Sequence, residues 1–161
     1  MASLEIDKLI LIPAFLNPFK SSTFAPSELR LQWMQKIATK YKKVEISDIE
    51  IVAQKPMPSY QTIQALKLRY NLENKPYMII GADNVSSLPQ WANFEMLNES
   101  VTFVVATRKD YEFSENFLRL DVDYDISSTR LRQSVDPSAL PPYLSDEIMK
   151  YYKEHHAREI R

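Results

Sequence analysis

The strongest constraint on the fold is a repeated alternation of short, mostly apolar runs with amphipathic segments. The apolar runs occupy residues 8–12, 77–80, 101–106 and 120–124. Runs of this length are typical of strands buried on both faces. Because helical spacing of apolar residues separates them, we predict an α/β fold with one doubly wound parallel sheet and right-handed crossovers.

Finer predictions follow from turn and capping residues. Apolar alternation across residues 44–51 predicts another strand, with a bulge near Ser47 and Asp48 where the alternation slips. Ser27 and Ser59 are expected to cap the helices that they precede. The second of these helices should end near Asn71, and its expected core face consists of Ile63, Leu66 and Leu68. Residues 144–152 predict a closing helix.

Composition excludes several classes of function. A chain of 161 residues with 45% hydrophobic content fits one domain over residues 1–161. A net charge of -1 argues against nucleic acid or an anionic membrane as a partner. The absence of Cys excludes disulfides, thiolate metal sites and cysteine nucleophiles. Glu5, Asp7 and Pro13 make the first apolar run unlike a signal peptide or membrane span, so we predict a cytoplasmic protein.

Polar and cationic residues repeatedly follow the ends of the predicted strands. They are Lys20, the Gly81-Ala82-Asp83 sequence, Arg108, and residues 125–132. In open parallel sheets ligands gather beyond the carboxyl ends of the strands, so one edge of the sheet should collect the chemistry. Lys20 is equally compatible with a phosphate contact and with a solvated loop lysine.

Residues 125–132 predict a strand followed by a capped helix. Ser127, Ser128 and Thr129 precede Arg130 and Arg132. Free N–H groups and the positive end of the helix dipole favour an anion there, and guanidinium groups suit phosphate oxygens. An ordinary capped helix with surface arginines is the alternative. The density of hydroxyls and arginines favours a polyphosphate site.

Five further side chains have two interpretations each. Arg30 could point back toward the loop before its helix, or lie on the surface. Tyr60 and Thr62 could face a site from the first turn of a helix, or pack in the core. Asp83 could meet a ligand or cap a helix, and Trp91 could be a core aromatic or a platform for a flat heterocycle.

The set of available groups favours phosphoryl or nucleotidyl transfer. The sequence contains no Ser-His-Asp arrangement and no zinc ligand set, and His155 and His156 lie at the end of a helix without acidic partners. Phosphoryl and nucleotidyl transfer require mainly positioning and charge stabilisation, which the polar edge could supply.

In order and spacing, these motifs resemble those of bacterial nicotinate-nucleotide adenylyltransferase over nearly the whole chain. The matching segments are residues 13–20, Arg30 with Met34, residues 58–60, residues 80–83 with Leu88 and Trp91, Arg108, and residues 126–132. The combination of Gly-Ala-Asp, Leu-x-x-Trp and Ile-Ser-Ser-Thr-x-x-Arg is specific, although related nucleotidyltransferases share the last motif.

The resemblance implies transfer of AMP from ATP to nicotinate mononucleotide. The mononucleotide phosphate would attack the α-phosphorus of ATP in line, with Mg²⁺ carried by the phosphates and no protein nucleophile. Self-association is compatible with this activity. The residues implied for ATP are Lys20, Ser127, Ser128, Thr129 and Arg132. Those implied for nicotinate mononucleotide are Tyr60, Thr62, Gly81, Asp83, Trp91 and Arg108, with Trp91 near the pyridine ring.

The chain departs from the family pattern most strongly at its start. The family opens with a central strand and a Gly-rich turn that ends in His-x-Gly-His, whereas this sequence contains one glycine, Gly81, and no such segment. We therefore expect an N-terminally truncated domain that lacks its first strand, and assign no catalytic residue. Phe19 stands where the family often has His, and Gln61 follows Tyr60 where it often has Thr.

Two alternatives follow from these departures. The chain could be a non-catalytic remnant that binds nucleotide without turnover. It could also be a sister adenylyltransferase that uses nicotinamide mononucleotide or phosphopantetheine as the acceptor.

Overall fold

The protein forms two compact units, residues 1–123 and 124–161, which are described separately. The structure is a computed structural model, and it describes residues 4–17, 23–107, 116–122 and 140–159. In chain order the elements are β1 (Leu9–Leu11), α1 (Ser27–Ala38), β2 (Val44–Ile46), α2 (Ile49–Ala53), α3 (Ser59–Tyr70), β3 (Tyr77–Gly81), the 3-10 helix η1 (Ala82–Gln90), α4 (Phe94–Ser100), β4 (Thr102–Thr107), β5 (Leu118–Asp121) and α6 (Pro142–Glu159). The expectation of a single domain stays a prediction.

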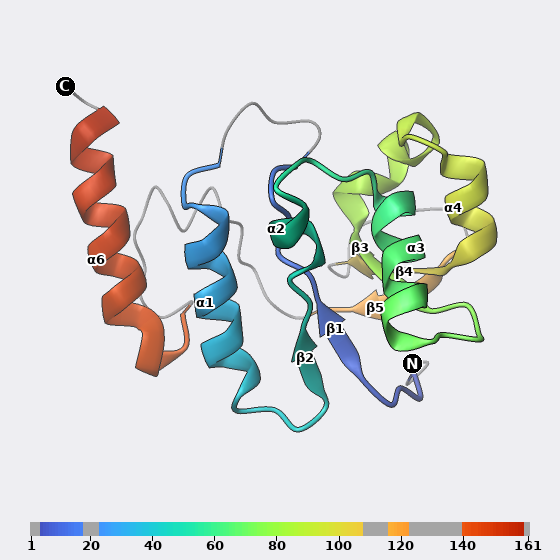
Figure 1. Cartoon of the computed structure of the whole chain (residues 1–161), viewed down its shortest axis with the longest axis horizontal. Helices are drawn as coiled ribbons and strands as arrows, with labels where there is room; N and C mark the ends of the chain where they lie inside the picture. Colours follow the sequence, from blue (N-terminus) through green and yellow to red (C-terminus); the bar gives the residue numbers. More distant parts are fainter. Residues whose placement is uncertain (1–3, 18–22, 108–115, 123–139, 160–161) are drawn as a thin grey trace. The chain divides into compact units, whose positions relative to one another are not determined.

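All strand pairs in the described part of the chain are parallel, which confirms the α/β class. β1 pairs with β2, and β3, β4 and β5 form a second sheet in sequence order (Figure 1). The described strands thus form two sheets where one was expected, because no ladder of hydrogen bonds joins β1 to β3. The expected absence of a first strand stays a prediction.

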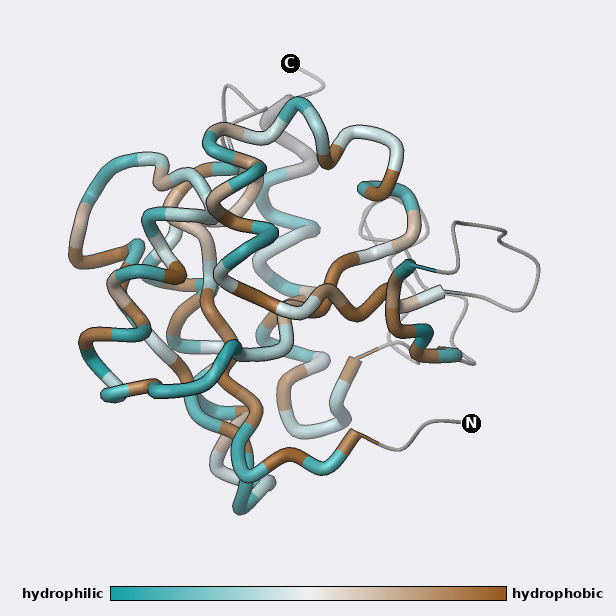
Figure 2. The backbone as a smooth tube through the Cα atoms, turned by 90° about the vertical axis from the view of Figure 1, so that its right-hand side faces the viewer, coloured by the Kyte–Doolittle hydropathy of each residue, from teal (hydrophilic) through white to brown (hydrophobic). Residues whose placement is uncertain are grey.

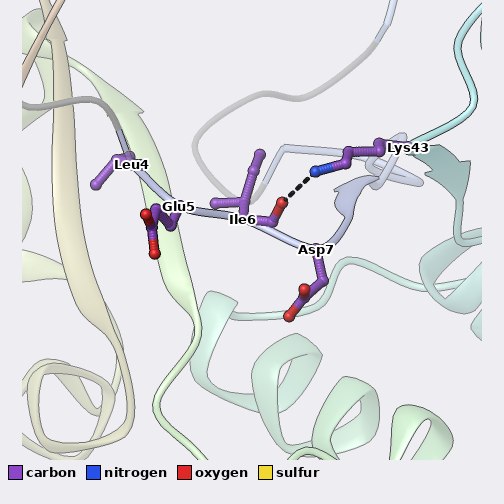
Figure 3. A pocket seen from close by; sticks show the side chains of 5 residues that line it. All are labelled: Leu4, Glu5, Ile6, Asp7 and Lys43. Atoms are coloured by element: carbon purple, nitrogen blue, oxygen red, sulfur yellow. Dashed lines mark hydrogen bonds between the residues drawn. The ribbon is translucent and has the colours of Figure 1, made fainter.

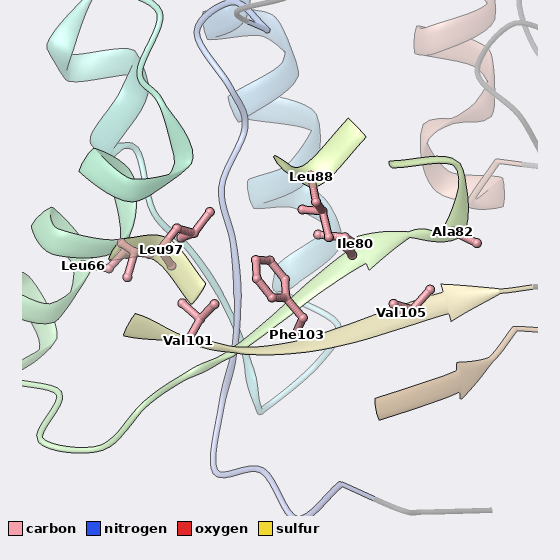
Figure 4. Packing of buried hydrophobic residues seen from close by; sticks show 9 residues of the cluster. Leu66, Ile80, Ala82, Leu88, Leu97, Val101, Phe103 and Val105 are labelled. Atoms are coloured by element: carbon pink, nitrogen blue, oxygen red, sulfur yellow. The ribbon is translucent and has the colours of Figure 1, made fainter. Parts of the chain in front are cut away.

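The main core lies on one face of the β3–β4–β5 sheet. Ile80, Phe103 and Val105 project from the strands and meet residues of α3, α4 and η1. Figure 4 shows the ring of Phe103 pointing toward Ile80 and Leu88. Hydrophobic and hydrophilic stretches alternate along the chain in Figure 2, as expected for elements that bury one side. This packing fixes the direction in which the loops leave the sheet.

The prediction of a strand across residues 44–51 is wrong in its second half. β2 ends at Ile46, and α2 begins at Ile49. The backbone N–H of Val52 donates to the carbonyl oxygen of Asp48 at 2.9 Å, which closes the first turn of α2. The slip in apolar alternation therefore marks the change from strand to helix and not a bulge.

Two further details of the helices also differ from prediction. Ser27 and Ser59 are the first helical residues and not the caps, because Pro26 and Pro58 occupy the capping positions. Leu68 is 85% exposed, whereas Leu66 and Ile63 are buried. Residues two apart on a helix lie on nearly opposite sides, so Leu66 and Leu68 cannot share one face. The end of α3 at Tyr70, with Asn71 as its cap, is as predicted.

The second unit contains α6, which confirms the predicted closing helix. Leu144 and Ile148 are buried and lie one turn apart. The ring of His155 stacks on Tyr151 with centroids 4.0 Å apart, and its Nδ1 lies 2.8 Å from the Tyr151 carbonyl oxygen. No helix in the described ranges is long and apolar enough to cross a membrane.

Candidate functional site

The ends of β3 and β4 lie at the same edge of the sheet, and predicted site residues follow each of them in the sequence. Gly81 is in register with Ala106, so residue 82 and residue 108 follow neighbouring strand ends. The gathering of polar side chains at this edge stays a prediction. Arg108 itself lies outside the described residues. The residues predicted to contact the ATP phosphates also lie outside them, namely Lys20, Ser127, Ser128, Thr129 and Arg132.

Gly81 leaves room for the carboxylate of Asp83. A Cβ atom at residue 81 would collide with Asp83 Oδ1, although the backbone φ of -71° suits any residue. The Asp83 carboxylate is the end of an exposed side chain that can move aside, so neither the space around residue 81 nor its backbone conformation by itself requires glycine. Asp83 Oδ1 accepts a hydrogen bond from Asn84 Nδ2 at 3.0 Å. Asp83 is not a helix cap, since Gly81 occupies that position, and its side chain stays exposed at the strand end.

Trp91 lies directly after η1 and packs as a core aromatic, and its role as a platform for a flat heterocycle stays a prediction. It is half-buried against the main core, and its backbone N–H donates to the Leu88 carbonyl oxygen at 3.0 Å. Its indole N–H is buried and finds no acceptor among the described residues. Leaving a buried donor unpaired is costly.

Tyr60 and Thr62 lie in the first turn of α3. Tyr60 is half-buried and packs against the main core. Thr62 is 5% exposed, and its hydroxyl donates to Glu50 Oε1 at 2.8 Å. The Thr62 hydroxyl is thus directed into the protein, and the roles of both residues toward a substrate stay predictions.

Glu50 is a functional candidate that sequence reasoning missed. It lies in α2, is 8% exposed, and is the one buried charged side chain in the described part of the chain. Burial raises its pKa, while the hydroxyl of Thr62, the backbone N–H of Phe15 and the charge of Arg30 act in the opposite direction. An acid between the apolar residues Ile49 and Ile51 was the available sequence signal.

Arg30 points back toward the loop after β1, which confirms one of its two interpretations and excludes the surface position. One terminal nitrogen of its guanidinium donates to the carbonyl oxygens of Ala14 at 2.6 Å and Phe15 at 3.0 Å. Its Nε donates to the carbonyl oxygen of Ala25 at 3.2 Å. The guanidinium therefore holds the loop backbone against α1.

A separate, open pocket lies before the amino ends of β1 and β2 (Figure 3). It is lined by Leu4, Glu5, Ile6, Asp7 and Lys43, and Lys43 Nζ donates to the carbonyl oxygen of Ile6 at 2.9 Å. Its lining residues precede the strands, whereas Gly81 and Asp83 end and follow a strand. This pocket is therefore not part of the candidate site. The described residues contain no cluster of three His, Asp or Glu side chains suited to a metal ion.

Comparison with known proteins gives a consistent result across most of the chain. Residues 1–134 match the family described as cytidylyltransferase-like. The chain is 45% identical over 154 residues to "Probable nicotinate-nucleotide adenylyltransferase" of Sulfurimonas denitrificans, covering 96% of this chain and 83% of that protein. It is 39% identical over 158 residues to the protein of the same name from Campylobacter fetus, covering 98% and 87%.

A solved structure confirms the fold. Plasmodium falciparum nicotinic acid mononucleotide adenylyltransferase complexed with NaAD superposes with a TM-score of 0.72 at 19% identity, over 92% of this chain and 83% of that one. The same enzyme complexed with APC superposes with a TM-score of 0.67. The agreement identifies a Rossmann-like nucleotidyltransferase fold.

Proposed function

The chain belongs to the nicotinate-nucleotide adenylyltransferases, within the cytidylyltransferase-like family, and from this membership we propose that it transfers AMP from ATP to nicotinate mononucleotide. The products are nicotinic acid adenine dinucleotide and pyrophosphate, in a step of NAD biosynthesis. The observation that carries the proposal is 45% identity over 96% of the chain. We further propose that the reaction takes place in the cytoplasm.

In the proposed reaction a phosphate oxygen of nicotinate mononucleotide attacks the α-phosphorus of ATP. The new P–O bond forms as the bond between the α-phosphorus and the bridging oxygen to the β-phosphorus breaks, and pyrophosphate leaves. Lys20 and Arg132, with the hydroxyls of residues 127–129, are the proposed partners of the ATP phosphates. Mg²⁺ bound with ATP would neutralise phosphate charge.

The proposed acceptor site lies at the ends of β3 and β4. The register of Gly81 with Ala106 supports it, since Asp83 and Arg108 follow these positions by two residues each. Trp91 is half-buried and would supply a flat apolar face for the pyridine ring. Tyr60 and Thr62 complete the proposed set from the start of α3.

The acceptor preference tests the function directly. We expect the purified chain, given ATP and Mg²⁺, to release pyrophosphate with nicotinate mononucleotide at a kcat/KM about tenfold or more above that with the nicotinamide form, because a hydrogen bond to a charged carboxylate is worth roughly 1.5–3 kcal/mol. Phosphopantetheine serves as a third acceptor. ATP binding without pyrophosphate release would instead support a non-catalytic remnant, and preference for another acceptor would support a sister enzyme.

The proposed role of Trp91 gives a second prediction. Trp91→Ala should raise KM for nicotinate mononucleotide about tenfold, because stacking of a base on an aromatic side chain is worth roughly 1–3 kcal/mol. The KM for ATP should change much less. Trp91→Phe keeps a flat ring and should retain most of the affinity. Steady-state kinetics with each substrate varied in turn would measure this, and a rise confined to the KM for ATP would contradict the assignment.

A further inference from the structure

The carboxylate of Glu50 joins three segments that are distant in the sequence. It belongs to α2, it accepts a hydrogen bond from the Thr62 hydroxyl of α3 at 2.8 Å, and it accepts a second from the backbone N–H of Phe15 in the loop after β1. All three residues lie within the first compact unit. One side chain thus holds both the loop and the first turn of α3.

Arg30 holds the same loop from the other side of its backbone. Its guanidinium donates to the carbonyl oxygens of Ala14 and Phe15, while the carboxylate of Glu50 accepts from the N–H of Phe15. The backbone carbonyl and N–H groups of Ala14 and Phe15 are therefore bound by two charged side chains, one from α1 and one from α2. Such an arrangement fixes the orientation of the peptide planes as well as their position.

Packing alone does not account for a carboxylate at this position. Burying a charge is costly, and apolar residues of similar volume often replace buried ionic groups without loss of stability. An apolar side chain at residue 50 could fill the space, but it could not accept hydrogen bonds from Phe15 and Thr62. The carboxylate therefore contributes orientation that a hydrophobic contact cannot supply.

Both segments that Glu50 holds lead to proposed substrate contacts. In the sequence Lys20, which is proposed to meet ATP phosphates, follows Phe15 by five residues. The first turn of α3 carries Tyr60, which is proposed to meet nicotinate mononucleotide. We propose that Glu50 is a positioning residue, assisted by Arg30, which sets these two segments in a fixed relation so that both substrates bind in reacting geometry. This inference rests on the proposed adenylyl transfer.

Glu50→Gln is the first test, because an amide retains one acceptor oxygen and replaces the other with a donor. The hydrogen bonds from Phe15 and Thr62 then lose their charged acceptor. We expect KM for ATP and for nicotinate mononucleotide each to rise about tenfold, the scale of one lost hydrogen bond to a charged group. Amide hydrogen exchange of residues 13–17 should accelerate by about the same factor.

Glu45→Gln is the matched control, since Glu45 is a partly exposed carboxylate of β2 paired with Lys8. It should leave both KM values and the exchange of residues 13–17 unchanged. Should Glu50→Gln fail to fold, Thr62→Val tests the link to α3 alone. Thr62→Val should raise the KM for nicotinate mononucleotide more than that for ATP, and Thr62→Ser, which keeps the hydroxyl, should restore it.

The outcomes separate this inference from the function on which it rests. A wild-type chain that does not release pyrophosphate contradicts the proposed function, and hydrogen exchange in Glu50→Gln still tests the positioning of the loop. An active wild type, together with a folded Glu50→Gln that keeps both KM values and normal exchange, would overturn the positioning role. A lowered melting temperature with unchanged KM values would show that Glu50 is merely structural, and would overturn it equally.

Discussion

Replacement of Arg132 by alanine is expected to lower kcat/KM for adenylyl transfer by about 100- to 1000-fold, the effect of removing one donor from a site that stabilises developing charge. Negative charge accumulates on the departing pyrophosphate as its bond to the α-phosphorus breaks. A guanidinium bound to those oxygens is worth more in this transition state than in the complex with ATP. The loss should therefore fall largely on kcat.

Arg69→Ala is the control for this measurement. Arg69 lies near the end of α3 in a partly exposed ion pair with Asp48 at 2.6 Å, and such pairs contribute roughly 0–1 kcal/mol. Its removal should leave kcat/KM unchanged. Arg132→Lys keeps the charge without the planar fork and should recover only part of the rate. An Arg132→Ala variant with wild-type kcat/KM would remove the basis for placing the ATP phosphates at residues 127–132.

The second large effect concerns stability. Leu97→Ala is expected to lower the free energy of unfolding by about 3 kcal/mol, within the range of roughly 2–5 kcal/mol for buried Leu-to-Ala substitutions. Leu97 has 0% of its surface exposed and lies in the cluster shared by α3, α4 and the β3–β4–β5 sheet. Truncation would leave a cavity where these elements meet. Urea denaturation followed by circular dichroism would measure the change.

Leu68→Ala provides the matched control for Leu97→Ala. It makes the same chemical change at a side chain that is 85% exposed, so the free energy of unfolding should change by less than about 0.5 kcal/mol. Equal losses in the two variants would contradict the placement of the core.

Prediction from the sequence succeeded where a local pattern has one physical interpretation. The apolar runs at 77–80 and 101–106 became the strands β3 and β4. Burial on both faces holds for β4 but is wrong for β3, because Tyr77 and Ile79 on one of its faces are each 45% exposed. Prediction failed at residues 49–51, where apolar residues at alternate positions suit either a strand or one turn of helix. The prediction that Leu68 belongs to the core face of α3 was wrong for a related reason, since hydrophobicity alone does not determine which side of a helix meets the core.

By itself the sequence determined the parallel α/β class, the closing helix and the family, because these depend on local periodicity and on motifs of fixed order. It also indicated that Gly81 and Asp83 lie at the end of a strand, where a ligand could bind. Only the tertiary structure decided that Arg30 turns to the loop after β1, and that Glu50 and Thr62 meet in the interior. Such pairings depend on the distance between segments far apart in the chain, and no local pattern of residues contains that distance.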